Sequence, residues 1–301
     1  MKSDRDSTKS RAVMHRKMIR KQFHHSRVED PECCSYRSWA RVTTFWSSCL
    51  VWSVLLGLLL IDTAIAQTSD NRSYCKSDGR IALFLVDITT PYDKTDKDII
   101  VKATDKILAS LNGGEKIIIR TITDSLTRSE QLIERCIPYC AAEGFSRIFL
   151  CNDGAIRTDR EGVYADIVES LRQRLAKFEE TRHSDILRTV VLAAKEDAVQ
   201  GRSLSLYIYS DLIENSDYLP GRKFFSTPVD RLIGQLRKDK LIAPLKNANV
   251  IAAGVGRGGT KDRRPLGVAE QRKVTEFWTA YFKESGANSV EVGQNMLEPS
   301  K

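Results

Sequence analysis

Carboxylate and hydroxyl side chains follow two apolar segments of this chain, at the points where buried strands would end. Asp87 ends one apolar run and is followed by Thr89, and Asp211 follows the run Leu204–Tyr209. Ser184 offers a further hydroxyl where another helix would start. Open α/β sheets bind ligands beyond the carboxyl ends of their strands, and Mg²⁺ prefers oxygen ligands in an octahedron that keeps several waters. Two carboxylates, those of Asp87 and Asp211, with hydroxyls nearby therefore suit a Mg²⁺ site at the strand ends.

A purely structural role is the alternative for these side chains. An Asp at a strand end often accepts a hydrogen bond from a neighbouring backbone N–H, which would account for Asp87 and Asp211 without any ligand. The hydroxyl of Ser210 can bond to the backbone in the same way. The sequence leaves both interpretations open.

Catalysis finds less support than binding. A Mg²⁺-dependent phosphohydrolase would use Asp87 as nucleophile, but such sites want a second acid two residues on, where Thr89 stands. His183 is the only histidine after residue 25, and no Gly-x-Ser-x-Gly nucleophile elbow occurs. A zinc site is not expected, because the pair Cys136 and Cys140 has no second pair beside it. We therefore expect a binding module and no enzyme.

The elements that would position these side chains alternate between strands and helices. Apolar runs without polar alternation predict buried strands of a mainly parallel sheet, here at residues 80–87, 116–122, 147–151, 204–209 and 249–254, with a closing edge strand at 289–292. Helical spacing predicts helices at residues 93–111, 129–136, 161–180, 185–199 (capped by Ser184), 229–238 and 268–285. This alternation predicts an α/β fold, doubly wound, with a mainly parallel central sheet and helices on both faces.

The last predicted helix is crowded with aromatic residues. Val274, Phe277 and Tyr281 share one face and are expected in the core, while Trp278 is a candidate for exposure and docking. The basic, glycine-rich loop Gly256–Gly267 is expected to be a surface loop.

The chain resembles the von Willebrand factor A-type (vWA) family over residues 80–292, in particular an exported or membrane-associated member of bacterial type. The resemblance implies a vWA/Rossmann-like fold and a module that binds other proteins. Four motifs carry it: the apolar strand into Asp87-x-Thr89, the helix start at Ser184, the strand into Ser210-Asp211, and the strand Asn249–Gly254.

The family's metal motif maps onto this chain residue by residue. The family pattern is Asp-x-Ser-x-Ser with a distant Thr and a distant Asp, and a carboxylate of the partner protein completes the metal's coordination. The resemblance gives Asp87 and Thr89 the first two roles, Ser184 the role of the distant Thr, and Asp211 that of the second acid. Pro91 stands where the second hydroxyl should be, and Ser184 lacks the family's glycine-rich lead-in. The resemblance therefore implies a degenerate metal-ion-dependent adhesion site, with a metal-free structural subunit of a cell-envelope complex as the alternative.

The N-terminal part of the chain carries a hydrophobic segment behind a basic arm. Val42–Ile61 holds twenty residues without a charge, enough to span about 30 Å as a helix. Residues 1–66 hold 11 Lys and Arg against 6 Asp and Glu, which favours a cytoplasmic arm. Ala64-Ile65-Ala66 fits a signal-peptidase site, so the segment is either a cleaved signal peptide or an uncleaved anchor, and the start at Met1, Met14 or Met18 stays open.

The resulting domain plan has five parts. We expect a basic cytoplasmic arm at residues 1–41, a signal peptide or transmembrane signal anchor at 42–66, a linker at 67–79, the vWA-like domain at 80–292 and a tail at 293–301. The domain would be exported to the periplasm or another extracytoplasmic space, either anchored in the membrane through residues 42–61 or released.

Cysteine usage and charge agree with export. The body keeps an even number of cysteines, which suits disulfides in an oxidising compartment but leaves three pairings open among Cys75, Cys136, Cys140 and Cys151. Beyond residue 66 the chain has 36 Lys and Arg against 33 Asp and Glu. This near balance lacks the basic stripe of a nucleic-acid-binding protein, so a protein partner at the strand ends is expected instead.

Overall fold

The computed structural model describes residues 74–90, 92–142, 144–177, 181, 183–196, 202–257 and 266–294. The basic arm, the hydrophobic segment at 42–66, Pro91 and most of the glycine-rich loop lie outside the described residues. Among the residues described, no helix combines the length and the apolar character needed to cross a membrane.

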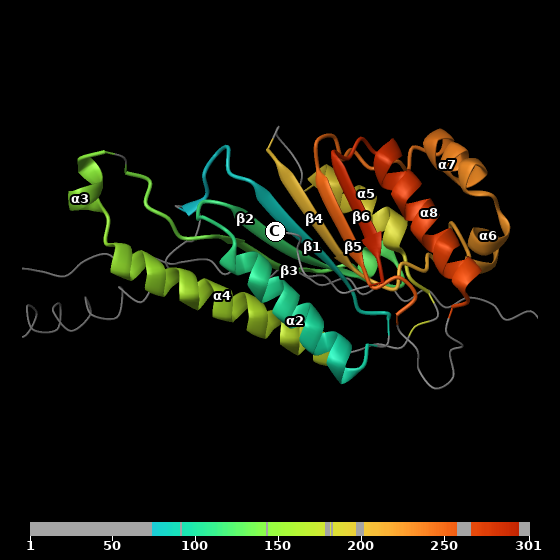
Figure 1. Cartoon of the computed structure of the whole chain (residues 1–301), viewed down its shortest axis with the longest axis horizontal. Coiled ribbons are helices and arrows are strands. Elements are labelled where there is room, and N and C mark those ends of the chain that lie inside the picture. Colours follow the sequence, from blue (N-terminus) through green and yellow to red (C-terminus); the bar gives the residue numbers. More distant parts are fainter. Residues whose placement is uncertain are drawn as a thin grey trace, which may run out of the picture. The chain divides into compact units, whose positions relative to one another are not determined.

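A six-stranded sheet forms the centre of the described domain (Figure 1). Its spatial order is β3-β2-β1-β4-β5-β6, and every neighbouring pair is parallel except β2 and β3. The strand order reverses between β1 and β4, which is the topological switch point where such sheets bind ligands. The strands are β1 (Ile81–Asp87), β2 (Lys116–Ile122), β3 (Gln131–Cys136), β4 (Leu204–Tyr209), β5 (Asn249–Ala253) and β6 (Ser289–Gly293).

Helices cover both faces of this sheet, as Figure 1 shows. One face carries α2 (Lys94–Ala109) and α4 (Asp153–Ala176). The other carries α5 (Ile186–Glu196), α6 (Gly221–Ser226), α7 (Val229–Lys238) and α8 (Val268–Glu284). Two short elements, the 3₁₀-helix η2 (Leu126–Arg128) and α3 (Ser146–Leu150), lie in connections.

The strand β1 is buried along its whole length because both of its faces are covered. Leu83 and Leu85 join the hydrophobic cluster under α5 and α8, whereas Phe84 and Val86 join the one under α2 and α4. This double burial explains why the strand reads as a continuous apolar run rather than an alternating one. The predicted fold class, α/β with a doubly wound and mainly parallel sheet, is confirmed.

Two predicted elements next to the sheet are wrong. Residues 129–136, predicted as a helix, contain the antiparallel edge strand β3, because the outer edge of β2 offers backbone groups that need partners. Residues 147–151, predicted as a strand, overlap the short helix α3, which lies outside the sheet. An apolar run as short as Ile148–Leu150 shows neither the helical nor the strand period. Its sequence pattern therefore cannot distinguish a helix from a strand.

Two disulfides select one of the three possible pairings. Cys75 bonds to Cys136 and Cys140 bonds to Cys151, with Cα–Cα distances of 5.1 and 5.8 Å. Both distances lie within the usual range for a disulfide. Paired cysteines of this kind are typical of proteins in an oxidising compartment.

Candidate functional site

The carboxylate of Asp87 is the centre of a buried polar cluster at the end of β1. One of its oxygens accepts from the backbone N–H and the hydroxyl of Thr89, at 2.8 and 2.6 Å. The other accepts from the hydroxyls of Thr90, Ser184 and Ser210, at 3.1, 3.2 and 2.6 Å. Asp87 itself is 0% exposed. Three separate segments of the chain therefore meet at one carboxylate.

The parallel register brings these segments together. Asp87 pairs with Ile122 on one side, and Val86 pairs with Tyr209 on the other, so β1, β2 and β4 end at the same edge. Ser210 follows β4 directly. Ser184 precedes α5 and is held beside this edge by paired backbone hydrogen bonds with Asn215.

The cluster offers the oxygen ligands that a hard cation needs. A carboxylate has about four lone-pair positions, so five donors saturate Asp87. The hydroxyls of Thr89, Ser184 and Ser210 give their hydrogens to Asp87 and keep lone pairs on their oxygens. Such an all-oxygen set is what Mg²⁺ accepts, and the residues present fit the ion.

The second predicted acid lies beside this cluster. Asp211 is 4% exposed and one of its carboxylate oxygens accepts from the backbone N–H of Ile213 at 2.9 Å. The pKa of the buried Tyr92 hydroxyl is raised well above its usual value, first by burial and then by the charges of Asp87 and Asp211. Both carboxylates therefore act on one hydroxyl. The structure places all four predicted ligands, Asp87, Thr89, Ser184 and Asp211, at this edge.

The predicted backbone role of the strand-end acids is present as well. Asp87 accepts from the N–H of Thr89 and Asp211 from that of Ile213, each two residues further along the chain. Ser210 accepts from the N–H of Leu212 at 2.9 Å while it donates to Asp87. The side chains of the cluster therefore also accept hydrogen bonds from the backbone N–H groups of the turns after the strands.

The turn after Asp211 has an unusual backbone. Leu212 has a φ of 60°, a left-handed conformation that side chains with a Cβ seldom adopt. Its carbonyl accepts from the indole nitrogen of Trp278 at 2.8 Å. Trp278 is 0% exposed, so its predicted exposure for docking is wrong. The indole is buried because its one polar atom finds a backbone acceptor inside the core.

A buried acid caps the helix that follows Ser184. Glu214 accepts from the backbone N–H groups of Ile186 and Leu187, both at 3.0 Å. These are the first free amides of α5, so the predicted capping by Ser184 is wrong, and its hydroxyl bonds to Asp87 instead. Burial raises the pKa of Glu214 to about 8, and the nearby charge of Asp185 adds to the effect.

Three residues of the site were not among the four predicted metal ligands. Thr90 and Ser210 both bond to Asp87, and each is adjacent in sequence to a predicted ligand, which was the available signal. Glu214 had no such signal, because an acid three residues after a strand-end Asp is ordinarily a solvated loop residue. Within the described part of the chain, no group of three or more His, Cys, Asp and Glu is placed to hold a metal. A cation here would therefore depend on hydroxyl oxygens.

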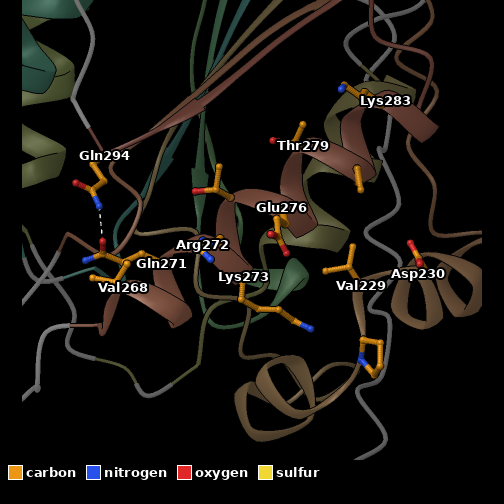
Figure 2. A pocket seen from close by; sticks show the side chains of 13 residues that line it. Val229, Asp230, Val268, Gln271, Arg272, Lys273, Glu276, Thr279, Lys283 and Gln294 are labelled. Carbon is orange, nitrogen blue, oxygen red and sulfur yellow. Dashed lines mark hydrogen bonds between the residues drawn. The ribbon is translucent and has the colours of Figure 1, made fainter.

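A separate hollow lies along α8 and contains none of these residues. Its volume is about 960 Å³. Figure 2 shows basic and acidic side chains along its wall, including Lys273, Glu276 and Asp230. The ammonium of Lys273 donates to the backbone carbonyl of Thr227. The hollow is open and lies away from the switch point between β1 and β4, so its size alone gives it no role.

Comparison with known proteins adds a distant structural likeness. No protein-family model matches the chain, and no curated protein matches it. Among solved structures, the crystal structure of the SpRpn10 VWA domain is similar over 72% of this chain and 89% of that chain, with 9% sequence identity and a TM-score of 0.32. A TM-score this low does not establish a shared fold. The fold class rests on the strand order described above.

Proposed function

We propose that this chain is an exported, vWA-like domain that binds a protein partner at the carboxyl edge of its sheet, with Mg²⁺ at the Asp87 cluster. The observation that carries the proposal is the meeting of hydroxyls from three segments of the chain, those of Thr89, Ser184 and Ser210, at one buried carboxylate. The cluster lies at the topological switch point, where α/β sheets bind their ligands.

The proposed Mg²⁺ would be held by residues already in place. The hydroxyl oxygens of Thr89, Ser184 and Ser210 would face the ion, while Asp87 orients these hydroxyls and Asp211 adds negative charge. Mg²⁺ ordinarily keeps several waters, one of which a carboxylate of the partner protein would replace.

The same geometry favours binding over catalysis. A nucleophilic carboxylate must reach its substrate, and Asp87 is 0% exposed with every acceptor position engaged. This supports a module without turnover. A metal-free structural subunit is the rival, because the five donors already balance the charge of Asp87 without an ion.

The proposed location follows from the disulfides and the hydrophobic segment. Cys75–Cys136 and Cys140–Cys151 suit an oxidising space such as the periplasm. The uncharged run at residues 42–61 would deliver the domain there, as an anchor or as a signal peptide cleaved after Ala66.

Calorimetric titration of the full chain with Mg²⁺ and Mn²⁺ tests the metal. We expect saturable binding that weakens about tenfold or more, equivalent to about 1.4 kcal/mol, in Asp87→Asn and Asp211→Asn. Asn keeps the shape of Asp, and Ser184→Ala is a milder variant should either Asn variant unfold. The matched control is Asp105→Asn, an exposed acid on α2, which should bind as the wild type does. Absence of saturable heat in the wild type would leave the metal-free subunit as the better description.

Photo-crosslinking tests the partner surface. A crosslinking side chain at the exposed position Asp217, in the loop after Asp211, should capture a protein partner in cells when divalent metal is present. The same group at Asp166, an exposed acid on α4, is the control and should capture nothing specific. Equal capture at both positions would argue against a partner site at the strand ends.

A further inference from the structure

The largest exposed apolar side chains of the described domain are gathered in one short loop. Phe145, Ile148, Phe149 and Leu150 are 75, 70, 72 and 76% exposed, and all belong to α3 or its first flanking residue. Figure 1 shows α3 beyond the start of α4, away from the sheet. Contiguous exposed apolar groups of this kind usually mark a surface that meets a partner or a membrane.

The loop holds these side chains outward by its construction. The disulfide Cys140–Cys151 closes it at its base, with 11 residues of sequence separation. The rings of Phe145 and Phe149 contact each other edge to face, with centroids 5.3 Å apart. Closing the loop lowers the entropy lost when its tip is ordered against a partner.

The loop and the Asp87 cluster lie at opposite edges of the sheet. Cys136 at the end of β3 pairs with Lys116 at the start of β2, which in turn pairs with Ile81 at the start of β1. Cys140 follows four residues later, so the loop leaves from the amino edge of the parallel strands. Asp87 ends β1 at the carboxyl edge, about 20 Å away along a strand of this length.

A basic hollow lies at the base of the loop. Its volume is about 390 Å³, and its lining includes the cations Lys76, Arg147, Arg157 and Arg160 with the single acid Asp153. Arg147 forms an ion pair with Asp153 at 3.0 Å. The remaining positive charge beside the apolar tip complements an anionic lipid headgroup.

The described domain begins at the same edge of the sheet, next to the base of the loop. Cys75 is bonded to Cys136, and the ammonium of Lys76 lies 4.6 Å from the ring centre of Tyr139 at the base of the loop. Residues 62–74 separate Cys75 from the uncharged run ending at Ile61, and fourteen residue steps reach at most about 50 Å. A bilayer that holds residues 42–61 is therefore within reach of the loop.

We propose that the loop tip Phe145–Leu150 docks on an anionic phospholipid bilayer, with Phe145, Ile148, Phe149 and Leu150 in the interface and the basic hollow on a lipid headgroup. Apolar side chains flanked by cations are what interfacial binding requires. In this orientation the Asp87 cluster faces away from the membrane, toward a partner. The proposal rests on the anchored form of the proposed exported domain, in which residues 42–61 stay in the membrane, and is independent of Mg²⁺.

Hydrogen exchange of the full chain tests the docking. The chain is reconstituted in nanodiscs of phosphatidylcholine with phosphatidylglycerol and, separately, in amphipol without lipid. We expect the amides of residues 145–150 to exchange more slowly in the nanodiscs, by about tenfold or more. A docked amide can exchange only after the loop has left the bilayer. The double variant Ile148→Ser with Phe149→Ser should lose this protection. The control Val268→Ser removes an exposed apolar side chain elsewhere, 74% exposed, and should keep it.

The outcomes separate docking from attachment. Co-elution of the chain with the nanodisc reports attachment, and loop exchange reports docking, while slow exchange in β1 shows that each variant is folded. Co-elution with equal loop exchange in nanodisc and amphipol would overturn docking and leave attachment standing. Loss of both would overturn both. Protection that grows with protein concentration in amphipol would identify a second copy as the occupant and overturn the lipid proposal.

Discussion

Single residues at the switch point combine structural and ligand-binding roles. Asp87 is saturated by donors from the segments around Thr89, Ser184 and Ser210, so one carboxylate ties three parts of the chain together. In a fully buried setting each such bond to a charged group contributes about 1.5–3 kcal/mol. Substitutions here therefore affect folding as well as binding, and only near-isosteric variants separate the two.

Glu214 makes the free energy of unfolding depend on pH, and the variant Glu214→Gln isolates this effect. Burial raises its pKa from 4.5 to about 8, so the folded state holds a proton that the unfolded state releases between these values. The unfolding free energy should therefore fall as pH rises through that window and change no further above it. Glu214→Gln keeps an acceptor for Ile186 and Leu187 and cannot ionise, so above pH 8 it should be more stable than the wild type by at least about 1 kcal/mol.

Urea unfolding on both sides of this window measures the effect. Glu161→Gln, an exposed position on α4, is the matched control and should follow the wild type at each pH. A wild-type stability that does not decline across the window would mean that Glu214 is ionised in the folded protein.

At the scale of elements, α8 braces the turn that carries Asp211. Trp278 donates to the carbonyl of Leu212, and Tyr281 one turn later donates to the carbonyl of Leu241 at 3.0 Å. Both rings are 0% exposed. The two side chains thus make the same kind of bond from the same helix, but only Trp278 bonds to the turn that follows Asp211.

Trp278→Phe should weaken Mg²⁺ binding at the site more than Tyr281→Phe does. Each variant leaves a buried carbonyl unpaired, at a cost of about 1–3 kcal/mol in the free energy of unfolding. Only Trp278→Phe removes the bond that holds Leu212 at a φ of 60°, so only it should weaken Mg²⁺ binding in the calorimetric titration. Equal weakening in both variants would show that the effect comes from general destabilisation.

For the whole molecule, the two edges of the sheet divide the proposed tasks. The carboxyl edge carries Asp87 and Asp211, and the amino edge carries the disulfides and the apolar loop. The separation lets one edge meet a membrane while the other remains open to a partner.

The disulfides should differ in their contribution to stability. Cys75–Cys136 spans 61 residues and Cys140–Cys151 spans 11, and the chain-entropy model assigns the longer loop about 4 kcal/mol and the shorter about 3 kcal/mol. Replacing both cysteines of one pair by Ser and measuring denaturant unfolding checks the order. Greater loss from the Cys140–Cys151 pair would show that the short loop is coupled to the core and does not only present its tip.

Much of the fold could be read from the sequence where one physical signal dominated. Strands β2 and β4 were predicted with the bounds that the structure has, because strands buried on both faces need continuous apolar runs. Helix α7 was likewise predicted with its observed bounds, because its apolar positions recur at helical spacing. The residues Asp87 and Asp211 were found because polar groups at strand ends stand out against such runs.

Tertiary structure decided what depends on neighbours distant in the sequence. Residues 131–136 became a strand because β2 needed a partner at its edge, and Trp278 was buried because Leu212 offered it an acceptor. The disulfide pairing and the capping of α5 by Glu214 join positions far apart in the chain. The sequence by itself determined which side chains stand at the strand ends. Only the folded chain determined that hydroxyls from three segments meet at Asp87, because that meeting depends on the strand order and not on local spacing.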